Sequence, residues 1–144
     1  MAKNLSSLFA LRDLRTFPLS AMHVIMGMRL CILYGQAGRD PLPDLAVRLR
    51  SMDAARRIER IVRVVQAAWP EPFLIHRPCS MTLTPDETVI AQLAMAASDG
   101  DEARATTLLG DMLKRQVIDD LFLGLVAAVA AIQSARFQPQ RREA

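Results

Sequence analysis

The sequence feature that most constrains the fold is the uncharged stretch LFLGLVAAVAAI, residues 121–132. A surface helix carries a polar stripe, whereas this stretch is apolar on every side, so it predicts a helix that is buried on most sides. Twelve residues are too few to cross a bilayer, which takes about 20. We therefore expect no transmembrane segment and a last helix, from about 112 to 136, that is the most buried element.

A chain of 144 residues has limited means to surround such a helix, so the stretch also predicts a subunit interface at or above it. Its small residues would let another helix approach, and its larger ones would supply bulk. A second copy of the chain is the simplest partner, because two-fold homodimers are the commonest oligomers. The candidate interface comprises Leu121, Gly124, Leu125, Ala128, Val129 and Ile132.

The amino-acid composition predicts the fold class. Aromatic residues make up only 5% of the chain, so Leu, Val, Ile, Met and Ala must build the core. These residues favour helices over sheets. A chain of this length buries roughly 70% of its unfolded surface. We expect an all-α fold, a single compact bundle of five to seven helices over residues 1–144, with a frayed tail at about 137–144.

Local signals divide the chain into helices and connectors. Two apolar stripes out of register between 42 and 69 indicate a break near residue 52, where Ser51 or Asp53 could restart the helix. Three prolines make residues 70–83 an extended connector. The expected helices cover residues 5–15, 20–35, 42–52, 53–69, 85–97, 102–109 and 112–136.

The sharpest local signal is Thr84-Pro-Asp-Glu87. The Thr84 hydroxyl can accept a hydrogen bond from the Glu87 N–H, while the Glu87 carboxylate accepts one from the Thr84 N–H. Pro85 suits the first position of a helix. The pattern predicts a capping box that starts a helix at this point.

The connector carries one of the two histidines, His76, and one of the two cysteines, Cys79. The other pair, His23 and Cys31, lies eight residues apart on one expected helix, or roughly 12 Å along its axis. That separation is too large for two ligands of one zinc ion. We therefore expect no metal site. Cys79 is interpreted as a small buried hydrophobe, with a reactive thiol activated by Arg77 or the following helix as the alternative.

The helix expected at 20–35 is rich in methionine and also holds His23. A haem or copper site would use His and Met together, but the composition also suits an adaptable core helix. We expect no cofactor. Gly27 is interpreted as the place where a second helix approaches closely.

Residues 54–69 form the clearest amphipathic helix, with Arg56, Arg60 and Arg63 on its polar face. These arginines could bind phosphate, a membrane surface or an acidic partner. The simpler interpretation is a solvated face in which Glu59 pairs with Arg63. A net charge of +3 is too small to indicate nucleic acid by itself.

The segment PEPFLIHRPCSMTLTPDETVIAQLA, residues 70–94, resembles small uncharacterised bacterial all-helical proteins of the domain-of-unknown-function kind. The resemblance extends from about Leu8 to Met112. It implies a helical fold and no assigned activity, so no functional residue is transferred. This chain departs from the pattern by having only Cys79 in the connector.

No catalytic constellation is evident, because phosphate-loop, nucleophile-elbow and zinc-protease motifs are all missing from the sequence. We expect a non-enzymatic helical interaction or regulatory protein that binds a protein partner. The alternatives are a nucleic-acid-associated regulator and a small-molecule sensor with an apolar pocket near the methionine-rich helix. The N-terminal apolar run is interrupted by Arg12 and Asp13 and is no typical signal peptide. We therefore expect a cytoplasmic protein.

Overall fold

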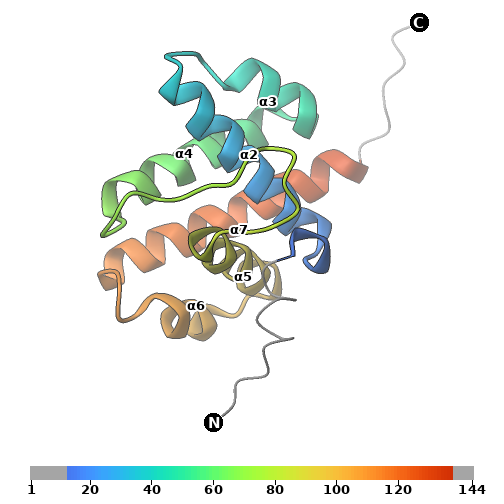
Figure 1. Cartoon of the computed structure of the whole chain (residues 1–144). Coiled ribbons are helices and arrows are strands. Elements are labelled where there is room, and N and C mark those ends of the chain that lie inside the picture. The colour runs from blue at the N-terminus through green and yellow to red at the C-terminus, as the bar shows by residue number, and fades with distance from the viewer. Residues whose placement is uncertain (1–12, 138–144) are drawn as a thin grey trace, which may run out of the picture.

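The computed structural model describes residues 13–137, and this part of the chain is all-α (Figure 1). It holds six α-helices and one short 3-10 helix, and no β-strand occurs within these residues. The all-α bundle is thus confirmed. The elements are η1 Leu14–Thr16, α2 Leu19–Gln36, α3 Leu42–Leu49, α4 Met52–Ala68, α5 Pro85–Asp99, α6 Glu102–Leu109 and α7 Arg115–Phe137.

Two of the expected elements lie at the ends of the chain. The helix expected at 5–15 falls mostly outside the described residues, and its end is the 3-10 helix η1. The frayed tail expected at 137–144 also lies outside them, except for Phe137.

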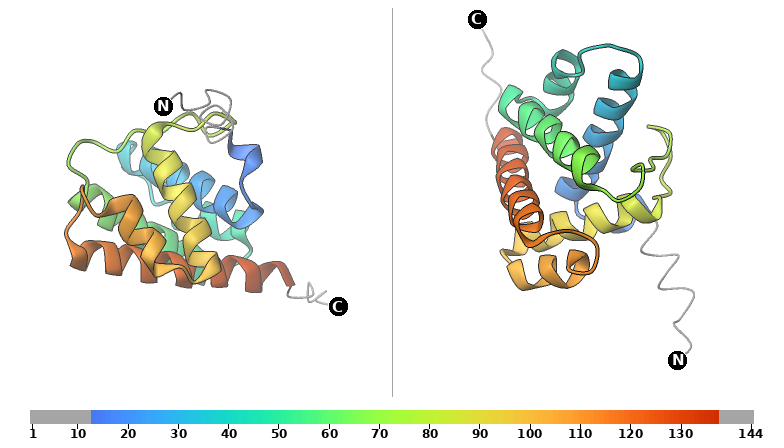
Figure 2. Two further views of the ribbon diagram at one scale, coloured as in Figure 1. Left: turned by 90° about the horizontal axis from the view of Figure 1, so that it is seen from below. Right: turned by 90° about the vertical axis from the view of Figure 1, so that its left-hand side faces the viewer.

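Helices α4 and α7 lie side by side and run in opposite directions (Figures 1 and 2). Ile61 of α4 faces Gly124 of α7, and the start of α4 lies near the end of α7, where Arg50 and Ile132 line one hollow. Helix α2 packs against both of them, α3 against α4, and α5 and α6 against α7. The connector 70–83 then crosses the molecule from α4 to α5.

The break expected near residue 52 is confirmed. Helix α3 ends at Leu49, and Arg50 follows in the left-handed region with φ 56°. Ser51 then caps α4, with its hydroxyl accepting the Ala54 N–H at 3.0 Å. The α3–α4 turn is therefore made by a left-handed residue followed at once by a side-chain cap.

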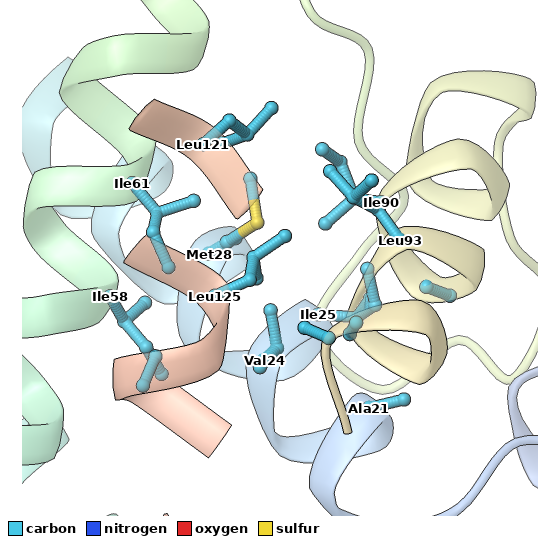
Figure 3. Packing of buried hydrophobic residues seen from close by; sticks show 14 of the residues in the cluster. Ala21, Val24, Ile25, Met28, Ile58, Ile61, Ile90, Leu93, Leu121 and Leu125 are labelled. Carbon is cyan, nitrogen blue, oxygen red and sulfur yellow. The ribbon is translucent and has the colours of Figure 1, made fainter. Parts of the chain in front are cut away.

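One hydrophobic core joins all six helices. Figure 3 shows its centre, where side chains from α2, α4, α5 and α7 converge. The central residues are Val24, Ile25, Met28, Ile58, Ile61, Ile90, Leu93, Leu121 and Leu125. The side chains are aliphatic or thioether, as the low aromatic content predicted.

Gly27 marks a close approach between helices, as expected. A Cβ atom there would lie 2.9 Å from Ile58 Cδ1 and 3.3 Å from Leu45 Cδ1. A larger residue there would require the Ile58 and Leu45 side chains to shift. The glycine thus allows the Ile58 and Leu45 side chains to pack directly against the backbone of α2.

Helix α7 is not the most buried element, and this expectation is wrong. Eight of its 23 residues are buried, whereas nine of 18 are buried in α2. It also begins at Arg115 rather than near Met112. An uncharged sequence lacks the polar stripe that would show which side faces solvent, so the pattern overstated its burial.

Candidate functional site

A buried ion pair, Arg29 with Glu87, joins α2 to the start of α5. Their side chains are 0% and 1% exposed, and Arg29 Nε donates to Glu87 Oε2 at 2.6 Å while Nη2 donates to Oε1 at 3.1 Å. A buried charge of this kind is stabilised only when every polar atom is bonded. The remaining Arg29 donors meet this condition.

Those donors bind the connector between α4 and α5. Arg29 Nη1 donates to the carbonyls of Arg77 and Ser80 at 3.2 and 2.7 Å, and Nη2 donates to that of Thr82 at 3.1 Å. Together with the two bonds to Glu87, all five N–H groups of the guanidinium are used. Residues 77–82 are therefore folded around one side chain of α2.

Glu87 is at the same time part of the capping box. Its Oε1 accepts the Thr84 N–H at 3.0 Å, and the Thr84 hydroxyl accepts the Glu87 N–H at 3.0 Å, which confirms the predicted cap. The Thr84 hydroxyl also donates to the Leu74 carbonyl at 2.7 Å. One carboxylate thus starts α5 and neutralises Arg29. The sequence signal for the Arg29–Glu87 pair is that Arg29 is a lone charged residue within the apolar helix α2. Nothing in the sequence pattern indicated its partner, which lies 58 residues away.

The two candidate groups of the connector face solvent. His76 and Cys79 are both exposed, so the interpretation of Cys79 as a buried hydrophobe is wrong. The backbone of the connector is held by Arg29 instead, which leaves the Cys79 side chain outside the core. A reactive Cys79 stays a prediction. Cys31 is buried in α2, and burial raises the pKa of its thiol to about 12.

Metal-ligating side chains are scattered in the structure. Across residues 13–137, no three His, Cys, Asp or Glu side chains gather where they could hold one ion. His23 and Cys31 occupy α2, while His76 and Cys79 lie on the connector.

The arginine face of α4 is exposed, as the sequence predicted. Arg56, Arg60 and Arg63 all face solvent. The expected pair of Arg63 with Glu59 is present at 2.7 Å, and Arg57 pairs with Asp53 at 3.1 Å. Arg63 of this face and Arg57 at its edge are therefore balanced by carboxylates of the same helix, which weakens the face as a phosphate-binding surface.

The six residues predicted as an interface lie mostly in the core of the chain itself. Gly124 is half-buried and contacts α4, where a Cβ would lie 3.6 Å from Ile61 Cγ1. The packing of α4 and α5 on α7 accounts for the burial without a second subunit. The buried members are Leu121, Leu125, Ala128, Val129 and Ile132.

The opposite side of α7 is exposed and uncharged. Leu123 is 64% and Phe137 82% exposed, and no charged residue occurs between Asp120 and Arg136. We call this surface the α7 outer face. It consists of the exposed Leu123, Val126, Ala130, Ser134 and Phe137 and the half-buried Ala127. It is about 21 Å long, at 1.5 Å per residue.

A groove of about 270 Å³ runs beside the α7 outer face, between α7 and α4. Both charge signs occur on its rim, with Arg57 and Arg60 from α4 and Asp120 from α7. Its apolar lining residues are Ile61, Val64, Leu121, Leu123, Gly124 and Ala127. The surface is therefore an apolar strip beside a groove whose rim carries both charges.

By length and composition alone, α7 could also cross a membrane, and among residues 13–137 it is the one helix that meets this test. The core helix of a water-soluble protein meets the same test. Here 39% of the most apolar part of α7 is buried against other helices. The finding is weak evidence for a membrane segment, since the chain's own core uses one side of the helix.

No known family model, curated protein or solved structure matches this chain significantly.

Proposed function

We propose that this chain is a non-enzymatic helical interaction protein that acts through the α7 outer face, and that its first partner is a second copy of itself. The observation that carries the proposal is the exposed Leu123 in a strip without charge. Exposed apolar surface of this continuity is typical of a site for a partner. The arginine face of α4 gives less support to a nucleic-acid partner, because Arg63 and the neighbouring Arg57 are already paired with carboxylates.

The α7 outer face is suited to pairing with itself. It carries no charge, so two copies can meet without burying an unpaired charged group. Ala127 and Ala130 permit close approach of the two backbones, while Leu123 supplies a bulky side chain. An isologous two-fold interface uses the same surface twice, which this composition allows.

The charges at the rim of the groove support the same pairing. In an antiparallel pair of α7 helices that cross near Leu123, Asp120 of each copy approaches Arg57 and Arg60 of the other. Positive and negative side chains line the same groove in each copy. The two-fold symmetry of the dimer therefore forms this contact twice. Such rim charges set register more than affinity.

The test is the mass in solution, measured by light scattering over a range of concentrations. We expect a dimer for the wild type and a monomer for Leu123→Glu, whose exposed position allows the change without unfolding. Leu74→Glu is the matched control, because Leu74 is 62% exposed but lies on the connector. It should remain dimeric.

Charge reversal tests the orientation of the pair. Asp120→Arg should weaken the dimer, and combining it with Arg60→Asp should restore it. A wild type that stays monomeric at all concentrations, or a Leu123→Glu variant as dimeric as the wild type, would contradict the proposal.

A further inference from the structure

Two adjoining hollows lie where α2, α3 and α7 meet, and they share the side chains of His23, Arg48 and Leu49. The first has a volume of about 290 Å³ and the second about 330 Å³. The first is also lined by Met26, Gly27, Leu30, Leu45 and Pro78. The second is also lined by Arg50, Ile132 and Arg136.

The first hollow is apolar apart from the two shared polar groups. The methionine-rich helix α2 forms one wall, and Pro78 of the connector that Arg29 holds in place forms another. Gly27 lies where a larger residue would meet Ile58 and Leu45. Small-molecule sites are commonly of this kind, with apolar walls and a few polar groups at one end.

The second hollow is cationic. Arg48, Arg50 and Arg136 line it, and no carboxylate from residues 13–137 does. Within residues 13–137 none of these three guanidinium groups has an ion pair or a hydrogen bond. The carboxylates on neighbouring turns are engaged elsewhere, Asp44 with Tyr34 and Asp53 with Arg57. The three guanidinium groups are exposed and offer their N–H donors to an anion in the hollow.

The backbone of Arg50 gives an independent reason to assign a role to its side chain. Its φ of 56° makes it the one residue other than glycine with positive φ in the described part of the chain. Glycine is favoured at such a helix end, and the cap uses only the Arg50 N–H, which donates to the carbonyls of Ala46 and Val47. The guanidinium contributes nothing to this cap. An arginine at a position suited to glycine points to a use for the side chain.

His23 supplies a polar group at the junction of the two hollows. Its Nδ1 is buried and has no hydrogen-bond partner within residues 13–137. Burial, and secondly the charge of Arg136, lowers the pKa of this imidazole. A neutral imidazole has one N–H donor and one acceptor. The His23 side chain therefore adds a polar group to the boundary between the two hollows.

We propose that the two hollows form one site for a small amphipathic anion, with an aliphatic body in the apolar hollow and a carboxylate or phosphate head between Arg48, Arg50 and Arg136. Guanidinium groups bind both heads through paired, charge-assisted hydrogen bonds. The site lies beside α2 and α3 and does not depend on the α7 outer face. The proposal gives the alternative function, a small-molecule sensor with a pocket near the methionine-rich helix, a defined location and a ligand class.

Calorimetric titration with four probes tests the ligand class. Octanoate and octyl phosphate each carry a tail and a charged head, 1-octanol lacks the charge, and acetate lacks the tail. We expect one or both charged amphiphiles to bind, and 1-octanol and acetate to bind at least about tenfold more weakly. The stronger of the two charged probes identifies the head group. Equal binding of 1-octanol and octanoate, or no binding of either charged amphiphile, would overturn the proposal.

Two variants test the cationic end. Arg136→Gln and Arg50→Gly should each weaken binding of the better charged probe by about tenfold or more. Arg104→Gln is the control, because it removes one positive charge from α6, away from both hollows.

Arg50→Gly separates a binding role from a structural one, because glycine suits the left-handed conformation. The variant should be at least as stable as the wild type and yet bind more weakly. If both variants bound the probe as tightly as the wild type, the arginines would have no role in binding and the proposal would be wrong.

Discussion

Arg29 illustrates how much one residue decides in this protein. Removing an arginine from water costs several kcal/mol, and the full set of five hydrogen bonds offsets that cost. In return, the side chain fixes the path of residues 77–82, which would otherwise have few partners. The carbonyls that it binds at Arg77 and Ser80 lie on either side of the exposed Cys79 and of Pro78, which lines the apolar hollow.

Substitution of the Arg29–Glu87 ion pair tests its contribution to stability. Arg29→Met should lower the free energy of unfolding by about 3–5 kcal/mol, because it leaves Glu87 and three connector carbonyls without their donor. Glu87→Gln keeps an acceptor for the capping box and removes only the charge. Urea unfolding of both single variants and the double variant gives the coupling energy, which we expect at about 1–3 kcal/mol. Strictly additive costs would show that the pair is not coupled.

At the scale of elements, α7 is a helix with two faces that the sequence does not distinguish. Val129 and Leu123 both belong to the same uncharged stretch, yet Val129 is 3% exposed and Leu123 is 64% exposed. The helices α4, α5 and α2 cover one side and leave the other open. The packing of the neighbouring helices, and not the apolar pattern, therefore decided which residues of α7 belong to the core and which to the surface.

This difference predicts opposite outcomes for one substitution at two positions of α7. Val129→Asp should cost about 3 kcal/mol or more, because it buries an unpaired charge. Leu123→Asp should change stability by no more than about 0.5 kcal/mol. Thermal unfolding should be measured at concentrations where the midpoint no longer depends on concentration, so that any dimer does not contribute. Similar costs at both positions would mean that α7 does not have the two faces described.

At the scale of the whole molecule, the connector 70–83 is part of the same structure as the core. Trp69 packs edge-on against Phe73, with ring centroids 5.2 Å apart, and its Nε1 donates to Asp86 at 3.2 Å. The end of α4, the connector and the start of α5 are thereby joined. Since all six helices share one core, the described part of the chain should unfold as a unit.

That cooperativity is the prediction at this scale. The single tryptophan, Trp69, reports on the connector, whereas far-UV circular dichroism reports on the helices. Unfolding in urea followed by the two signals should give the same midpoint and the same slope. A fluorescence change well before the loss of helix would show that the connector and its Arg29 contacts unfold separately.

The sequence by itself determined the features that depend on residues close together in the chain. The all-α class, the break near Ser51, the capping box at Thr84 and the exposed arginine face of α4 were all predicted from it. Each depends on hydrogen bonds or apolar spacing within one or two helical turns, which a local pattern records. The close approach at Gly27 also came from the sequence, although its partners did not.

Only the tertiary structure decided which distant residues meet. Arg29 and Glu87 are 58 positions apart, and the three arginines of the cationic hollow come from two helices and a turn. No spacing rule relates such residues, because their separation depends on how the helices pack. The open side of α7 has the same origin. An apolar stretch indicates that its side chains favour burial, but it does not indicate which of them the other helices will cover.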